Sequence, residues 1–148
     1  TSAKSAGVVG GLMWLVDTNI WLELLLEQER AGEVRQFLQE TPAESLWMTD
    51  FSLYSIGIIL MRVGKSSLWE DFVSDVVERS ETRLVSLSVK ELKQIPALGL
   101  RLGLDFDDAY QYIVAEKYDL TLVSFDADFD RTPRGRRTPG EMILGIRR

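Results

Sequence analysis

The 148-residue sequence contains no cysteine and no histidine. The first absence excludes disulfides and thiolate nucleophiles, and the second excludes imidazole general bases and Ser/His relays. Together they exclude the usual ligand sets for zinc. Chemistry on this chain must therefore use carboxylates, hydroxyls, lysine or arginine. Because carboxylate and water oxygens suit hard cations such as Mg²⁺ and Mn²⁺, a metal-dependent carboxylate site is the first class of enzyme to consider.

The sequence also lacks a run of 18 apolar residues and the basic and apolar regions of a signal peptide. We therefore expect a soluble, cytoplasmic protein without a membrane partner. Its length predicts one globular domain. Residues 1–11 are small and rich in glycine, so they are expected to form a flexible leader or a cloning remnant, and the domain is placed at residues 12–148.

Charge is distributed unevenly along the chain. Residues 130–148 contain six arginines and two acids, which gives +4, so a net charge of −6 leaves −10 on the first 129 residues. This basic segment is either a solvated terminus or a contact surface for phosphates. If it binds RNA, the candidate residues are Arg131, Arg134, Arg136 and Arg137.

Short apolar segments alternate with stretches of helical periodicity. Strands are expected at residues 12–16, 45–49, 83–87 and 120–125, with helices at 20–30, 32–40, 50–63, 67–80, 88–102 and 107–118. Pro96 should bend or break the helix at 88–102 near Gln94 and Ile95. Continuous apolar strands separated by helices predict βαβ units and a parallel α/β sheet.

Aspartates follow two of the expected strands. Asp17 comes directly after the first strand and Asp126 after the last, so both are expected at the carboxyl edge of the sheet, where such folds bind ligands. Asp105 is the expected N-cap of the helix at 107–118, which puts Asp108 at its third position and points Asp107 elsewhere. Each acid alone also fits a helix cap or a solvated turn. Gathered at one edge, however, they would repel each other unless a cation neutralised them.

These residues resemble the PIN-domain family, the metal-dependent ribonucleases that include VapC-type toxins of bacterial toxin–antitoxin pairs. The motifs that carry the resemblance are Asp17-Thr18-Asn19, Asp108-Ala109 and Ser124-Phe125-Asp126-Ala127-Asp128-Phe129. The resemblance covers nearly the whole domain, and it implies a three-layer α/β/α fold with a central parallel sheet of four to five strands.

The resemblance also implies roles for these residues. Asp17, Asp108 and Asp126 would be catalytic and would bind Mg²⁺ or Mn²⁺ together with Asp128, so that a metal-activated water attacks an RNA phosphodiester. Thr18, Asn19, Ser124 and Asp105 would support the carboxylates. A small antitoxin protein and a second copy of the chain are the implied protein partners, and the four tryptophans and the apolar stretch 55–61 fit a homodimer.

Ser55 marks a departure from the family. PIN domains carry a glutamate about six residues past the Ser or Thr that closes the second strand, and counting from Thr49 leads to Ser55. The expected helix places Ser55 on a stripe with Ser52, Ile56, Ile59 and Val63, so its hydroxyl should face the acidic pocket. If the count is out of register, Asp50 and Asp105 are the first candidates for the missing acid.

Two other functions remain open at this point. The vacancy at Ser55 fits a catalytically weakened PIN-like module that binds RNA or protein without cutting it. Aspartates at strand ends also fit an Asp-based phosphoryl-transfer domain of the receiver or haloacid-dehalogenase type. The dehalogenase pattern, however, requires an aspartate where this chain has Asn19. A receiver domain normally has a lysine after a late strand, and this chain has no lysine after Lys117.

Overall fold

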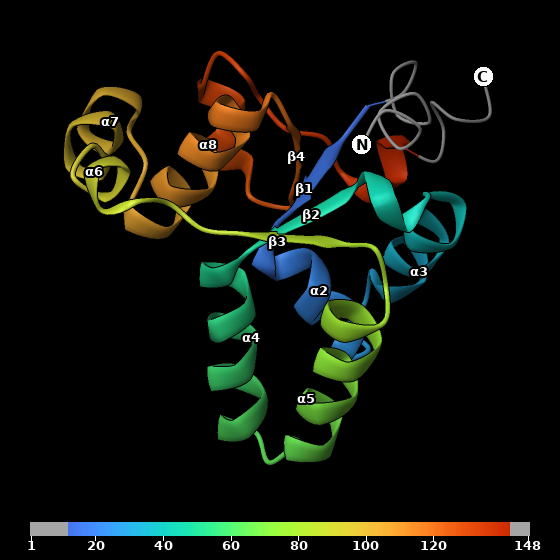
Figure 1. Ribbon diagram of the computed structural model, residues 1–148. Coiled ribbons are helices and arrows are strands. Elements are labelled where there is room, and N and C mark those ends of the chain that lie inside the picture. Colours follow the sequence, from blue (N-terminus) through green and yellow to red (C-terminus); the bar gives the residue numbers. More distant parts are fainter. Residues whose placement is uncertain (1–11, 143–148) are drawn as a thin grey trace.

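The computed structural model describes residues 12–142 and shows a central sheet with helices on both sides (Figure 1). The expected leader at residues 1–11 lies outside the described residues, as do Arg147, Arg148 and the rest of 143–148. None of the helices within residues 12–142 is both long and apolar enough to cross a bilayer.

Four parallel strands form the sheet in the order β3-β2-β1-β4. They are β1 (Trp14–Val16), β2 (Leu46–Thr49), β3 (Arg83–Val85) and β4 (Thr121–Val123). Leu15 pairs with Trp47 on one side and with Leu122 on the other, so β1 is central. Because all pairs are parallel, the residues that follow the strands meet at one edge of the sheet.

Helices cover both faces, which confirms the three-layer α/β/α architecture. One face packs against α8 (Phe106–Tyr118), and α7 (Ile95–Leu102) packs against α8, with the short helix α6 (Val89–Leu92) beside α7. The other packs against α2 (Thr18–Leu25), α3 (Ala31–Glu40), α4 (Asp50–Arg62) and α5 (Ser66–Phe72). Short 3₁₀ helices lie at Ala43–Ser45 and Ala127–Arg131, and a π-helix at Val73–Glu78 extends α5.

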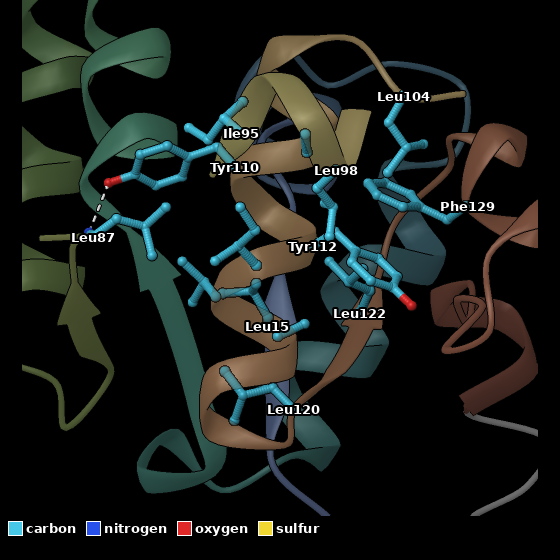
Figure 2. Close-up of a cluster of buried hydrophobic side chains, with 14 of the residues drawn as sticks. Leu15, Leu87, Ile95, Leu98, Leu104, Tyr110, Tyr112, Leu120, Leu122 and Phe129 are labelled. Carbon is cyan, nitrogen blue, oxygen red and sulfur yellow. Dashed lines mark hydrogen bonds between the residues drawn. The ribbon is translucent and has the colours of Figure 1, made fainter. Parts of the chain in front are cut away.

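Alternating side chains of the strands supply two hydrophobic cores. Leu15 and Leu122 point toward α8, whereas Val16, Met48 and Val123 belong to the core on the other face. Figure 2 shows the first core, in which Leu15, Leu120 and Leu122 lie against α8. There the hydroxyl of Tyr110 accepts a hydrogen bond from Leu87 N (3.0 Å), which joins α8 to the segment after β3.

The expected elements are present, with shorter strands and with helix ends that are shifted by a few residues; α2, for example, begins at Thr18 and ends at Leu25, where a helix was expected at 20–30. The helix expected at 88–102 breaks into α6 and α7 at residues 93–94, because Pro96 is tolerated only in the first turn of a new helix. Val63 is 51% exposed and caps the end of α4, so its predicted place on the core-facing stripe was wrong.

A segment beyond β4 returns to the sheet. Arg137 forms an isolated parallel bridge with Val123: its N–H donates to Leu122 O (2.8 Å), and its C=O accepts from Ser124 N (3.0 Å). This bridge extends the four-stranded sheet by one residue at the outer edge of β4.

Candidate functional site

A cleft of about 310 Å³ opens at the carboxyl edge of the sheet. It brings together residues from the end of β1, from α2, α4 and α8, and from the turn after β4. Its lining consists of Asp17, Thr18, Asn19, Leu22, Phe51, Ser55, Ile59, Asp107, Asp108, Gln111 and Asp126. No cationic side chain lines this cleft in the described part of the chain, so four carboxylates face it without a basic partner in its wall.

Asp17 is buried at the end of β1 and caps α2. Its Oδ1 accepts hydrogen bonds from Thr18 N (2.8 Å) and Gln111 Nε2 (2.9 Å), and its Oδ2 accepts one from Ser124 Oγ (2.6 Å). Burial raises the pKa of Asp17, while these hydrogen bonds, which favour the carboxylate, oppose that rise.

Ser124 and Asn19 connect the turn after β4 to the start of α2. Ser124 Oγ accepts from Asp126 N (2.9 Å) and from Asn19 Nδ2 (3.3 Å), and Asn19 Oδ1 accepts from Phe125 N (3.2 Å). Both residues were singled out in the sequence as supporting groups. In the structure, their hydrogen bonds hold the backbone at Asp126 in a fixed position relative to Asp17.

The start of α8 holds three carboxylates. Asp105 is the N-cap and accepts from Asp108 N (3.4 Å), as predicted from the sequence. The expectation for Asp107 was wrong, because it lines the cleft beside Asp108. A residue in the first turn of a helix can face the same opening as its neighbour where the cleft extends past the helix end, which sequence spacing alone does not reveal.

Burial and neighbouring carboxylates act together on the ionisation of Asp108. Burial, followed by the hydrogen bond and the negative charge of Asp126, raises the pKa of Asp108 to about 9. Burial also raises the pKa of Asp107, whereas hydrogen bonding to Asp107 lowers that of Asp105. Burial and the neighbouring carboxylates therefore favour the protonated form of Asp108 in the metal-free protein.

Asp126 and Asp128 extend this group from the turn after β4. Carboxylate oxygens of Asp108, Asp126 and Asp128 lie within 4.8 Å of one another, as do those of Asp105, Asp107 and Asp108. Asp126 caps the 3₁₀ helix by accepting from Asp128 N (2.9 Å). Oxygen-only ligands at this spacing fit a hard divalent cation, and the positive charge of such a cation would oppose the burial and repulsion that raise the pKa of Asp108.

The α4 side of the cleft is neutral. Ser55 lines the cleft and is partly buried, and Ser52 lies one turn earlier, fully buried, with its Oγ 2.8 Å from Thr18 Oγ1. Asp50 instead accepts a hydrogen bond from the hydroxyl of Tyr110 (2.6 Å). Neither Asp50 nor Asp105 lines the cleft, so neither of them takes the place of the family's glutamate beside Ser55.

Gln111 was not identified from the sequence. It is 2% exposed, lines the cleft, and bonds to Asp17, Ser52 and Thr49. The sequence did contain a signal for Gln111. It lies three residues after Asp108, and it is the one amide side chain in residues 109–115 of the helix, which are otherwise apolar or aromatic.

The candidate RNA-binding arginines make intramolecular contacts. Arg131 pairs with Asp128 (3.1 Å) and donates to Gly103 O (2.7 Å), and Arg136 pairs with Asp130 (3.1 Å). Arg134 pairs with Asp119 (2.8 Å) before β4 begins, at the end of that strand remote from the cleft. The side chain of Arg137 is exposed.

Comparison with known proteins places the chain in a family. Residues 14–135 match the PIN domain family, whereas no curated protein matches the chain. Among solved structures, Mycobacterium tuberculosis VapC20, described as a toxin that cleaves the sarcin-ricin loop, superposes with a TM-score of 0.71 at 18% identity, covering 82% of this chain and 95% of that one.

Two further structures show the same fold. A toxin–antitoxin complex from Klebsiella pneumoniae has a TM-score of 0.66 at 19% identity, covering 84% of this chain and 96% of that chain. The protein PAE2754 from Pyrobaculum aerophilum has a TM-score of 0.67 at 19% identity, covering 92% and 97%. The match over residues 14–135, together with this fold and the aspartate-lined cleft, makes the chain a member of the PIN domain family.

Proposed function

We propose that the chain is a Mg²⁺- or Mn²⁺-dependent endoribonuclease and the toxin of a toxin–antitoxin pair. The observation that carries this proposal is the convergence of Asp17, Asp108 and Asp126 on one cleft whose wall has no cationic side chain in the described chain. Membership of the PIN family removes the receiver and dehalogenase hypotheses. The descriptions of the similar structures as an RNA-cleaving toxin and a toxin–antitoxin complex support the proposal.

Asp17, Asp108 and Asp126 would hold the metal, with Asp128 completing the set. A bound divalent cation would lower the pKa of a water and neutralise charge on the phosphodiester. Ser124 and Asn19 orient the carboxylates through the hydrogen bonds described above. Thr18 and Ser55 line the cleft, and the Thr18 hydroxyl is hydrogen-bonded to Ser52 Oγ. Asp105 holds the first turn of α8, and with it Asp108, in place.

RNA approaches an acidic cleft only if cations near it offset the repulsion. Arg131, Arg134, Arg136 and Arg137 remain the proposed phosphate contacts. Arg131 pairs with the proposed ligand Asp128, and Arg136 donates to Ser124 O, so both lie near the proposed metal site. A guanidinium with one carboxylate partner retains donors for a phosphate. The cytoplasm is the compartment we propose, since a cellular RNA substrate would be met there.

In addition to the complex with an antitoxin, we propose that the chain forms a homodimer. Tyr54, Ile58 and Met61 are 62%, 56% and 65% exposed and recur on one face of α4, which we call the α4 stripe. Phe51 lies at the N-terminal end of this stripe, and its ring packs at a tilt against the ring of Phe106 in α8 (ring centroids 5.9 Å apart). The side chain of Phe106 is exposed as well. A continuous apolar strip of this kind favours burial against a second copy or the antitoxin.

The vacancy at Ser55 supports a second candidate function, a catalytically weakened module that binds RNA without cutting it. Calorimetry with Mn²⁺ and a cleavage assay on structured RNA separate the two. A nuclease binds Mn²⁺ and cleaves RNA in a way that EDTA abolishes, whereas a weakened module binds RNA but leaves it intact in saturating Mn²⁺. Retention of cleavage in EDTA would contradict the metal-dependent mechanism.

A further inference from the structure

We infer that Gln111 is the positioning residue that holds the Asp17 carboxylate in its cleft-facing orientation. The inference rests on the proposed metal-dependent function and concerns how this chain builds the same site without an acid at position 55. It starts from the contacts of one buried amide.

The Gln111 amide connects three elements. Its Nε2 donates to Asp17 Oδ1 and to Ser52 Oγ (both 2.9 Å), and its Oε1 accepts from Thr49 Oγ1 (2.7 Å). Asp17 follows β1, Thr49 ends β2 and Ser52 belongs to α4. The polar capacity of a 2% exposed side chain is thus satisfied by groups that surround the proposed metal site.

The surrounding hydrogen bonds determine which way the amide faces. Thr49 Oγ1 already accepts a hydrogen bond from Ser52 N (3.0 Å), so its single hydroxyl proton is available for Gln111. An ionised Asp17 can only accept hydrogen bonds, so the amide nitrogen of Gln111 is directed at Asp17, and the amide oxygen on the other side accepts the Thr49 proton. Asp17 and Thr49 together fix the orientation of the Gln111 amide, and the amide in turn holds the Asp17 carboxylate.

Other side chains of similar size at position 111 would not orient the Asp17 carboxylate. Glutamate would place a second carboxylate beside Asp17 and could not donate to it when ionised. Leucine would leave the Thr49 hydroxyl without its acceptor and Asp17 Oδ1 without one of its two donors. Glutamine alone among these supplies a neutral donor and an acceptor at opposite sides of one planar group.

The position on α8 adds a geometric link. Gln111 lies three residues after Asp108, so the same face of one helix carries a proposed ligand and the group that orients another. With Ser124 bound to Oδ2 and Gln111 to Oδ1, rotation of the Asp17 carboxylate would break a hydrogen bond on either side. Partners of this kind change metal affinity by roughly 10–100-fold when they are removed.

The test measures Mn²⁺ affinity by calorimetry on the full chain, for the wild type and for Gln111→Leu. We expect Mn²⁺ to bind Gln111→Leu roughly 10–100-fold more weakly. The Mn²⁺ concentration for half-maximal RNA cleavage should rise by a similar factor, with recovery of kcat at saturating metal. Thr41→Val is the control: it removes a buried hydroxyl that bonds to Phe37 O, away from the cleft, and should lower the melting temperature without changing Mn²⁺ affinity.

A second variant keeps the inference testable if Gln111→Leu does not fold. Thr49→Val removes the proton that orients the amide, so it should weaken Mn²⁺ binding in the same direction. In the double variant the two losses should not add, because both act through the same amide. If Gln111→Leu or Thr49→Val bound Mn²⁺ with wild-type affinity, the inference would be wrong but the proposed function would stand. If the wild type failed to bind Mn²⁺, the proposed function itself would be wrong.

Discussion

Ser124 Oγ lies 2.6 Å from Asp17 Oδ2, while the other oxygen of that carboxylate accepts from Thr18 N and Gln111 Nε2. All three donors are neutral, so they orient Asp17 without cancelling its charge. Asp17→Asn keeps the size of the side chain, and its oxygen can still accept from Thr18 N and Gln111 Nε2. Its nitrogen would face Ser124 Oγ, which already accepts from Asp126 N and Asn19 Nδ2, so the variant should fold with a lower melting temperature than the wild type.

Because Asp17→Asn removes a ligand charge, RNA cleavage in Mn²⁺ should fall by orders of magnitude. A fluorescence assay with a quenched RNA substrate measures this loss. Asp71→Asn, an exposed carboxylate on α5, is the matched control and should cleave at the wild-type rate. Undiminished cleavage by Asp17→Asn would rule out Asp17 as a ligand.

Ser55→Glu should restore a charged ligand to the α4 side of the cleft. A further carboxylate increases the attraction for a hard cation, so Mn²⁺ binding measured by calorimetry should tighten, whereas the metal-free form should lose stability because the added charge faces Asp17 and Asp108. Ser67→Glu adds the same charge at an exposed position of α5 and should change neither quantity. Unchanged Mn²⁺ affinity in Ser55→Glu would mean that the family's acid position has no counterpart there.

Stability of the metal-free protein should decrease as pH rises from 5 to 8. Burial and Asp126 raise the folded-state pKa of Asp108 to about 9, so over this range the folded carboxyl binds a proton that the unfolded one has released. The pKa values of Asp17 and Asp107 are raised as well, which acts in the same direction. We expect a loss of about 1 kcal/mol in the free energy of unfolding, less than the full shift implies because solvent in the open cleft screens the charges.

Urea unfolding in EDTA at both pH values measures this effect. The chain has no histidine, so apart from its amino terminus the ordinary titrations lie outside this pH range. Asp108→Asn should flatten the profile. In wild-type protein, Mn²⁺ at about 100 times its Kd should add about 2.7 kcal/mol. A flat profile for the metal-free wild type would show that folding does not raise the pKa of Asp108.

Self-association through the α4 stripe predicts that Ile58→Glu converts a dimer to a monomer. Burying a charge at the centre of an apolar interface costs more free energy than the contact between the two copies provides. Ile58 is 56% exposed within one chain, so the substitution should not affect folding. Sedimentation equilibrium gives the mass directly. Val89→Glu, at a 73% exposed position on α6, serves as the control. A wild-type monomer, or an Ile58→Glu dimer, would disprove this arrangement.

The layout of the sheet and the three principal aspartates could be predicted from the sequence for a physical reason. Buried parallel strands are continuously apolar, and a polar residue directly after such a strand reaches the carboxyl edge wherever the strand lies in the sheet. The N-cap at Asp105 followed from local hydrogen bonding, which operates within a single turn.

The remaining features depend on contacts between distant segments. Gln111 orients Asp17 from 94 positions away along the chain, and Arg134 is held by Asp119 before β4. Such partners are set by helix rotation and by the path of a loop, neither of which is encoded in a local pattern. The direction of Asp107 was missed for the same reason, because the opening it faces is bounded by α4 as well as by its own helix.

The bridge between Arg137 and Val123 has a consequence for solubility. An uncovered strand presents a row of free N–H and C=O groups that a strand of another molecule can pair with, and such pairing leads to aggregation. By bonding to Leu122 and Ser124, the returning segment occupies those groups along β4 and leaves β3, at the opposite side of the described sheet, as the exposed edge. That edge is only three residues long and begins with Arg83, whose charge opposes stacking of like copies. We therefore expect the segment around Arg137 to reduce pairing between the sheets of different molecules, an effect that does not depend on any nucleic acid.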